Sequence, residues 1–63
     1  MDKLVDIAAE LRHETDKAYL LFDGSKNIDG TNRVEWVPKS QVEANGDGTF
    51  TMPEWLAEEK GFI

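Results

Sequence analysis

The absence of cysteine constrains this chain more than any other feature, because it has only 63 residues from which to build a core. A domain of this size buries about 60% of the surface that its unfolded form exposes, so its core is marginal. Small folds often compensate with disulfides, a metal ion or a partner chain. Disulfides and thiolate metal sites are excluded here, and the single histidine, His13, cannot build a His-rich metal site. We therefore expect a single domain over residues 1–63 that binds no metal or cofactor and that gains from forming a homodimer.

The charge of the chain bears on its partners. Thirteen acidic residues oppose seven basic ones, which gives a net charge of −6. This charge repels nucleic acids and anionic membranes and favours basic partners, although acidity also simply keeps small proteins soluble. No run of about 18 apolar residues is present, and "MDKLVDIAAEL" is acidic where a signal peptide would be basic. We expect a cytoplasmic protein without membrane contact.

Alternating apolar residues predict most of the fold. Residues 3–14 fit both a helix and a strand: their Ala, Leu and Glu favour helix, whereas a first strand would supply sheet area that the core needs. Consistency of the whole domain favours the strand. Residues 18–24, "AYLLFDG", predict a clear strand with apolar side chains on both faces. A long polar loop over residues 25–32 then leads to a strand over residues 33–44.

The stretch "EWVPKSQVE" (residues 35–43) places a proline inside this last strand. Pro38 cannot donate a ladder hydrogen bond, so the strand should bend or end there. Trp36 is predicted to be the large core residue just before the bend. Lys39 and Gln41 are predicted to be available to solvent or a partner.

Residues 45–63 predict a turn, a short strand and a helix. "NGDG" is a strong turn signal and "TFTM" continues as a strand. Thr51 and Glu54 match a capping box with Pro53 in the first helical turn, and Gly61 stands where a left-handed C-cap belongs. The helix would dock through Trp55, Leu56 and Phe62. The predicted fold class is α+β: a small antiparallel β-meander of three to four strands with one short C-terminal helix packed on it.

No set of residues spells out a reaction. His13 lies among acids with no positioned partner for acid–base chemistry. "GSKNIDG" does not follow the order of a phosphate-binding loop, and "DGSKNIDGTN" does not meet the spacing of a calcium loop. We therefore expect no enzyme activity, no catalytic residues and no metal-binding residues.

Two stretches, "EWVPKSQVE" and "DGTFTMPEWLAEEKGFI", together resemble a group of small phage and mobile-element proteins. These carry a W-[VIL]-P-K-S-Q strand and end in a M-P-x-W-L-A-x-E-K-G helix. The resemblance covers residues 15–63 and implies a genomic setting and a fold rather than a mechanism. It also implies a strand over residues 3–14. The insert "GSKNIDGTN" departs from the tighter turn expected in such proteins.

These observations predict a non-enzymatic, acidic protein-interaction module of phage or mobile-element type. It would inhibit or modulate a nucleic-acid-handling complex of the bacterial host, such as a CRISPR-type defence complex, by occupying a basic surface. The residues predicted to bind this partner are all acids: Asp47, Glu54, Glu58, Glu59, Asp23 and Asp29. In a helix, Glu54 and Glu58 would share one face.

Two alternatives remain open. The first is a small single-stranded nucleic-acid-binding accessory protein of phage replication, in which aromatic rings stack on bases and cations meet phosphates. Its residues would be Trp36, Tyr19, Lys39 and Arg33, but interleaved acids interrupt the expected basic stripe, so direct nucleic-acid binding is not expected. The second is a homo-oligomeric structural module, with Val37 and Leu21 as an exposed apolar patch for dimer contact.

Overall fold

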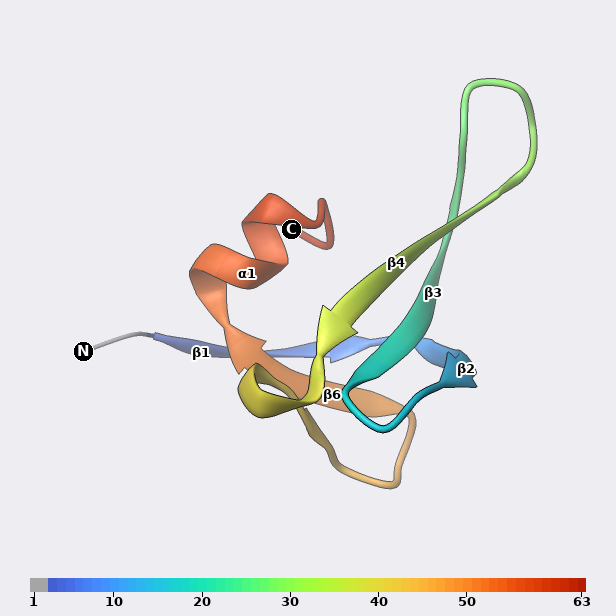
Figure 1. The fold of residues 1–63 in the computed structure, drawn as a ribbon. Helices are drawn as coiled ribbons and strands as arrows, with labels where there is room; N and C mark the ends of the chain where they lie inside the picture. The colour runs from blue at the N-terminus through green and yellow to red at the C-terminus, as the bar shows by residue number, and fades with distance from the viewer. Residues whose placement is uncertain (1–2) are drawn as a thin grey trace.

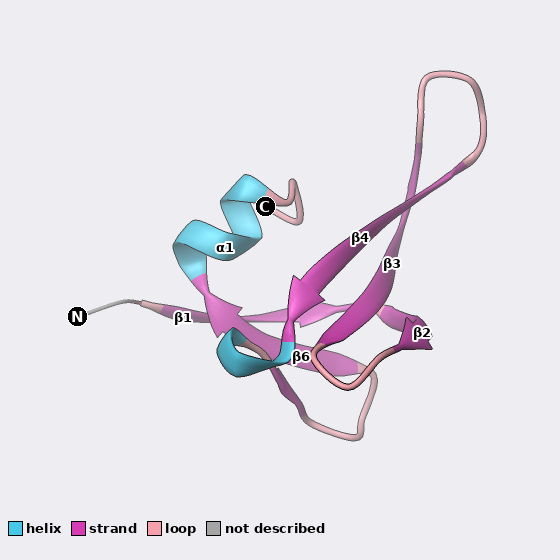
Figure 2. Ribbon diagram, in the orientation of Figure 1, coloured by secondary structure: helices cyan, strands magenta, loops and turns pink. Residues whose placement is uncertain are grey.

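Two antiparallel sheets of three strands each make up most of the computed structural model, which describes residues 3–63. The first sheet has the order β1 (Leu4–Ala8), β6 (Thr49–Pro53), β5 (Glu43–Ala44). The second has the order β2 (Glu10–Glu14), β3 (Ala18–Lys26), β4 (Asn32–Pro38). A short 3-10 helix, η1 (Lys39–Gln41), follows β4, and α1 (Glu54–Glu59) follows β6 (Figures 1 and 2). The predicted α+β class is confirmed, with more strands than the three to four expected.

The N-terminal segment over residues 3–14 is extended, as the consistency of the whole domain predicted, but it is not one straight strand. It bends at Ala9, so that β1 belongs to the first sheet and β2 to the second. The Ala9 N–H donates to the Gly48 carbonyl at 3.0 Å, just beyond the last β1–β6 pair of Ala8 with Thr49. The bend was not predicted because no glycine or proline marks it. One continuous segment therefore links the two sheets.

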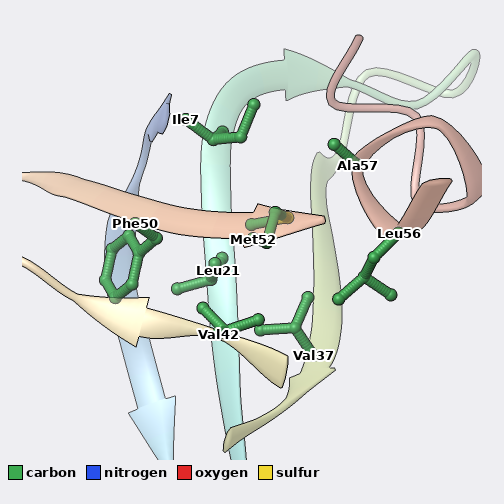
Figure 3. Packing of buried hydrophobic residues seen from close by; sticks show 8 residues of the cluster. All are labelled: Ile7, Leu21, Val37, Val42, Phe50, Met52, Leu56 and Ala57. Carbon is green, nitrogen blue, oxygen red and sulfur yellow. The ribbon is translucent and has the colours of Figure 1, made fainter. Parts of the chain in front are cut away.

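The core contains residues from both sheets and from α1 (Figure 3). Leu21, Met52 and Ala57 are fully buried. The buried residues of the core cluster are Ile7, Leu21, Val37, Val42, Phe50, Met52, Leu56 and Ala57. Phe50 and Met52, two residues apart on β6, are both buried in this core.

The predicted orientation of β4 is wrong. Trp36, expected in the core, is 43% exposed, whereas Val37 and Leu21, expected at the surface, are 1% and 0% exposed. Alternation along a strand sorts residues into two faces, but it does not say which face is covered when both are apolar. Here the chain after β4 folds back on the Val37 side and brings Val42 into the same core.

The bend predicted at Pro38 is confirmed. Pro38 is the last residue of β4 and precedes η1. The Lys39 N–H donates to the Lys17 carbonyl at 2.8 Å, which ties the bend to the β2–β3 turn. Gln41 is exposed, whereas Lys39 is half-buried because its ammonium group binds Glu14.

The start of α1 differs from the predicted capping box. The helix begins at Glu54, and Pro53 in extended conformation is its N-cap, without a side-chain cap hydrogen bond. Thr51 lies within β6, where its hydroxyl donates to Asp6 Oδ1 of the neighbouring strand at 2.5 Å. The capping-box prediction is therefore wrong, because strand pairing holds Thr51 away from the helix end.

The end of α1 follows the prediction. Gly61 has a φ of +78°, and its N–H donates to the Glu58 carbonyl at 3.1 Å. The Phe62 N–H donates to the Ala57 carbonyl at 2.8 Å, which completes a Schellman motif. Phe62 packs against the core, as predicted. Trp55, however, does not dock fully and stays 46% exposed.

The predicted loop over residues 25–32 is largely a hairpin. β3 continues to Lys26 and β4 begins at Asn32, and these two residues are paired. A turn over residues 27–31 closes the hairpin, with the Asn27 N–H donating to the Thr31 carbonyl at 2.7 Å. The hairpin extends away from the rest of the molecule at the upper right of Figure 1.

Candidate interaction surface

An apolar surface lies on the side of the β2–β3–β4 sheet that faces away from the core. Leu20 pairs with Trp36, and Phe22 pairs with Val34, so the four side chains project on one side of the sheet. Val34 is 38% exposed and Trp36 is 43% exposed, while Leu20 and Phe22 are half-buried. We call this surface the outer face. None of the four belongs to the core cluster or to the partly buried residues packed against it.

β2 supplies a polar border to the outer face. The His13 ring meets the Trp36 indole edge-on, with ring centroids 6.0 Å apart and planes at 87°. The Arg12 guanidinium lies 5.4 Å from the centre of the Phe22 ring and binds Glu10 at 3.1 Å. In this border the Arg12 guanidinium contacts the Phe22 ring and its charge is balanced by the Glu10 carboxylate. Charged and polar groups of this kind are typical of the rim of a protein interface.

The outer face was missed because a large aromatic residue is more often buried than exposed. One signal for it was present: residues 18–24 are apolar on both faces, as expected for a strand partly covered on its second side. In the structure α1 packs on β1 and β6 instead. The second apolar side of β3 therefore remains open to solvent.

Three of the predicted partner-binding acids hold turns or bulges. Asp23, Asp29 and Asp47 each begin an Asp-Gly-Ser/Thr triplet. In every triplet the aspartate Oδ1 accepts a hydrogen bond from the backbone N–H two residues later, at 3.0, 3.1 and 3.0 Å respectively. The glycines in the three triplets all have φ near +90°. These carboxylates therefore have a local structural role of the kind that aspartate plays in turns.

The hydrogen bonds in these triplets change the acidity of the carboxyl groups. Bonds from the Thr31 hydroxyl and N–H lower the pKa of Asp29 below its ordinary value of 3.8, and Thr49 does the same for Asp47. At Asp23, partial burial raises the pKa, but bonds from Ser25 and the charge of Arg33 outweigh it and the pKa is lowered. All three groups are therefore held in the charged form.

The other predicted acids, Glu54, Glu58 and Glu59, lie on α1. Glu54 pairs with Lys3 at 3.4 Å, while Glu58 and Glu59 are exposed. The turn that contains Asp29 and the turn that contains Asp47 lie at opposite ends of the molecule in Figure 1. The six acids are therefore spread over α1, one strand and two turns, and the fold does not gather them on one surface.

The residues of the nucleic-acid alternative are also separated. Trp36 is on the outer face, whereas Tyr19 packs against the core with its ring 5.7 Å from that of Phe50. Lys39 binds Glu14 at 2.5 Å and lies 5.0 Å from the Tyr19 ring. Both terminal nitrogens of Arg33 donate hydrogen bonds to the Lys60 carbonyl at the end of α1. Trp36 alone of the four is placed to meet a ligand on the outer face.

Within residues 3–63, no group of three or more His, Cys, Asp or Glu side chains is arranged to hold a metal ion. No described helix is long and apolar enough to cross a membrane. In comparisons with known proteins, no family model, no curated protein and no solved structure matches the chain. The resemblance to small phage and mobile-element proteins therefore stays a prediction.

Proposed function

We propose that the protein is a non-enzymatic interaction module that binds a partner protein through the outer face. The observation that carries this proposal is an open apolar surface, centred on the 43%-exposed Trp36, in a chain whose core is complete on the other side of the same sheet. Contiguous exposed apolar groups with a polar rim are typical of interaction sites. Tryptophan is among the residues that contribute most to binding energy when an interface covers them.

The charge of the chain supports a basic partner. At −6, the protein attracts a positively charged surface and is repelled by free nucleic acid. We propose a nucleic-acid-handling host protein, such as a component of a defence complex, as the class of partner. The outer face would then provide affinity, while the dispersed acids, Glu58 and Glu59 among them, would raise the association rate.

Paired tryptophan variants test the outer face. Trp36 and Trp55 are similarly exposed, at 43% and 46%, but they lie on the sheet and on α1 respectively. Tagged wild type, Trp36→Thr and Trp55→Thr would be used to capture partners from bacterial lysate, and the captured protein would be identified, purified and titrated by calorimetry. We expect Trp36→Thr to weaken binding by about tenfold or more and Trp55→Thr to leave it unchanged. Equal binding by both variants, or a loss only with Trp55→Thr, would contradict the proposal.

Single-stranded nucleic acid is the second candidate, and one observation favours it. The Trp36 and Phe22 rings lie on one open sheet face, bordered by Arg12 and His13, which is the arrangement of a base-stacking platform. Against it, Arg12 is already paired with Glu10 and the whole chain is acidic. Titration of Trp36 fluorescence, in a Trp55→Phe background, with labelled single-stranded DNA at low salt would decide. Salt-sensitive micromolar quenching would favour this candidate.

A further inference from the structure

The β3–β4 and β5–β6 hairpins are closed by the same turn sequence, Asn-x-Asp-Gly-Thr. It occurs as "NIDGT" over residues 27–31 and as "NGDGT" over residues 45–49. In both turns the asparagine N–H donates to the threonine carbonyl, at 2.7 and 3.1 Å respectively, and the asparagine amide donates to the threonine hydroxyl at 3.0 Å. The threonine hydroxyl donates to the aspartate, at 2.7 and 2.6 Å. The two turns are therefore matched in these contacts, and each serves as a reference for the other.

The turns differ in the residue that follows the asparagine. Ile28 follows Asn27, whereas Gly46 follows Asn45 and has a φ of +80°. The Gly30 N–H donates to the Asn27 carbonyl at 2.9 Å and tightens the first turn. In the second turn, the structure of residues 3–63 shows no backbone bond to the Asn45 carbonyl and none from the Gly46 N–H. Asn45 and Gly46 are both exposed. The second turn is therefore the more open of the two, and its Gly46 nitrogen is free to react.

An open Asn-Gly pair has a known chemical reactivity, because glycine has no side chain to keep its backbone nitrogen away from the asparagine amide. The Gly46 nitrogen attacks Cγ of Asn45 and forms a new C–N bond. The bond from Cγ to Nδ2 then breaks, and Nδ2 leaves as ammonia with the proton lost from the Gly46 nitrogen. A water molecule opens the resulting cyclic imide at either of its carbonyls. The product is aspartate or, if the main chain runs through the side-chain carbonyl, isoaspartate.

The Asn45 amide also lies at the centre of a hydrogen-bonded network. Its Nδ2 atom donates to the hydroxyls of Thr49 and Thr51, at 3.0 and 2.9 Å. Each hydroxyl passes its own proton to a carboxylate, Thr49 to Asp47 at 2.6 Å and Thr51 to Asp6 at 2.5 Å. A hydroxyl has a single proton to donate, so both threonines need a donor at position 45. We call these five side chains the threonine network.

The threonine network joins all three strands of the first sheet. Asp6 lies on β1 and Thr51 on β6, and Asn45 directly follows β5. The matching amide of the other hairpin, that of Asn27, donates only to Thr31 of its own turn. The same chemical change should therefore have a larger effect at Asn45 than at Asn27.

We propose that Asn45 is a modification site: it deamidates spontaneously in the folded protein, and its product breaks the threonine network. A carboxylate at position 45 accepts hydrogen bonds but donates none, so three carboxylates would share two hydroxyl protons. Their like charges also repel one another. In the isoaspartate product, an additional main-chain carbon shifts the end of β5 as well. Deamidation thus loosens the first sheet, and this proposal does not depend on the function proposed above.

Peptide mapping of aged protein tests the reaction. Folded wild type would be kept in mildly alkaline buffer, where the backbone nitrogen loses its proton more readily, and sampled by mass spectrometry over days to weeks. We expect Asn45 to convert at least about tenfold faster than Asn27, its matched control. Gly46→Ala should slow the conversion of Asn45 by a similar factor, and an added Cβ there would meet no atom within 4 Å.

Urea unfolding tests the consequence. The deamidated fraction carries an additional negative charge, so anion exchange separates it from unreacted protein. It would be compared with wild type, Asn45→Asp and Asn27→Asp. We expect the deamidated fraction and Asn45→Asp to unfold at clearly lower urea concentration than wild type, and Asn27→Asp to lie closer to wild type. The deamidated fraction is made from folded protein, so this comparison holds even if Asn45→Asp fails to fold.

Three outcomes would overturn the proposal. Equal conversion of Asn27 and Asn45, or conversion of Asn45 only in urea, would show that the folded turn does not favour the reaction. Unchanged conversion in Gly46→Ala would exclude attack by the Gly46 nitrogen. A deamidated fraction as stable as wild type would show that the threonine network does not need the Asn45 amide.

Discussion

Trp36 and Val37 are neighbours on β4, yet the first is 43% exposed and the second is 1% exposed. Truncating a buried side chain removes its burial and leaves a cavity, whereas truncating a side chain at the surface has a much smaller effect on stability. Substitutions on the inner face of this sheet should therefore change stability, whereas substitutions on the outer face should change binding.

Replacing Trp36 by threonine should lower the free energy of unfolding by about 1 kcal/mol or less, because threonine keeps strand propensity at a partly exposed position. Leu21→Ala should lower it by about 2–5 kcal/mol, since Leu21 is fully buried. Urea unfolding followed by far-ultraviolet circular dichroism would measure both values. A loss of more than about 3 kcal/mol for Trp36→Thr would mean that the indole belongs to the core after all.

At the scale of elements, the three Asp-Gly-Ser/Thr triplets share one local structure, in which the aspartate accepts a hydrogen bond from the backbone two residues later. The Asp29 triplet closes the β3–β4 hairpin and the Asp47 triplet closes the β5–β6 hairpin, each with the carboxylate bound to a threonine hydroxyl and N–H. A charged carboxylate accepts these two hydrogen bonds more strongly than a neutral carboxyl group does. The two hairpins should therefore respond to acid.

Acidification should weaken both hairpins. Because the folded pKa of Asp47 is lowered below 3.8, its contribution to stability is fully present above that pH and is lost as pH falls through the folded pKa. Asp47→Asn should thus be less stable than wild type at neutral pH, and the difference should shrink as pH falls below about 4. Urea unfolding of both proteins between about pH 7 and pH 2 would measure it.

Glu59→Gln is a suitable control for this experiment, because Glu59 is exposed and no hydrogen bond or ion pair of its side chain is found in the described part of the chain. Its stability difference from wild type should not follow the same acid profile. A difference for Asp47→Asn that stays constant down to the acid limit would mean that the carboxylate charge does not support the turn.

How well each element could be predicted depends on how local its cause is. The strand at residues 18–24, the bend at Pro38 and the end of α1 at Gly61 follow from residues within a few positions of each other. The bend at Ala9 and the orientation of Trp36 depend on packing between segments that are distant in sequence. The pattern along β1, β2 and β4 alone does not determine either one; the apolar residues on both faces of the strand at 18–24 indicate only that a second apolar face exists.

At the scale of the whole molecule, Arg33 joins the long hairpin to the helix. Its guanidinium donates to the Lys60 carbonyl at 3.0 and 2.9 Å and to the Gly61 carbonyl at 2.9 Å. Asp23 and Glu35 lie 3.9 and 3.7 Å from the same group. These contacts satisfy carbonyls at the end of α1 that have no partner within the helix, and they place a positive charge where the helix dipole favours one.

Arg33→Ala should therefore lower the free energy of unfolding by about 1–3 kcal/mol, and Arg33→Lys should recover only part of it, because one ammonium group cannot reproduce the forked contact. Gly61→Ala should also destabilise, since Gly61 has a φ of +78° and an added Cβ would lie 2.7 Å from Arg33 Nη1. Urea unfolding of the single and double variants would test the link. The cost of Gly61→Ala should be smaller in the Arg33→Ala background; an equal cost in both would show that the two sites act independently.

The candidate site could be found only from the tertiary arrangement of the whole molecule. The acids and the aromatic rings were identifiable as chemical groups from the sequence, but their grouping was not. Asp29 and Asp47 are held in separate hairpins, and Tyr19 and Trp36 face opposite sides of one sheet. Only the pairing of β3 with β4 and the placement of α1 on β1 and β6 leave the outer face open.

The bend at Ala9 has a consequence for how this small molecule comes apart. Because β1 and β2 are consecutive parts of one segment, residues 4–14 contribute an end strand to each of the two sheets, as expected for one cooperative unit. Loss of the whole segment would remove an end strand from both sheets at once. We therefore expect that neither sheet stays folded without the other, so a cell's proteases would meet the molecule either fully folded or fully unfolded.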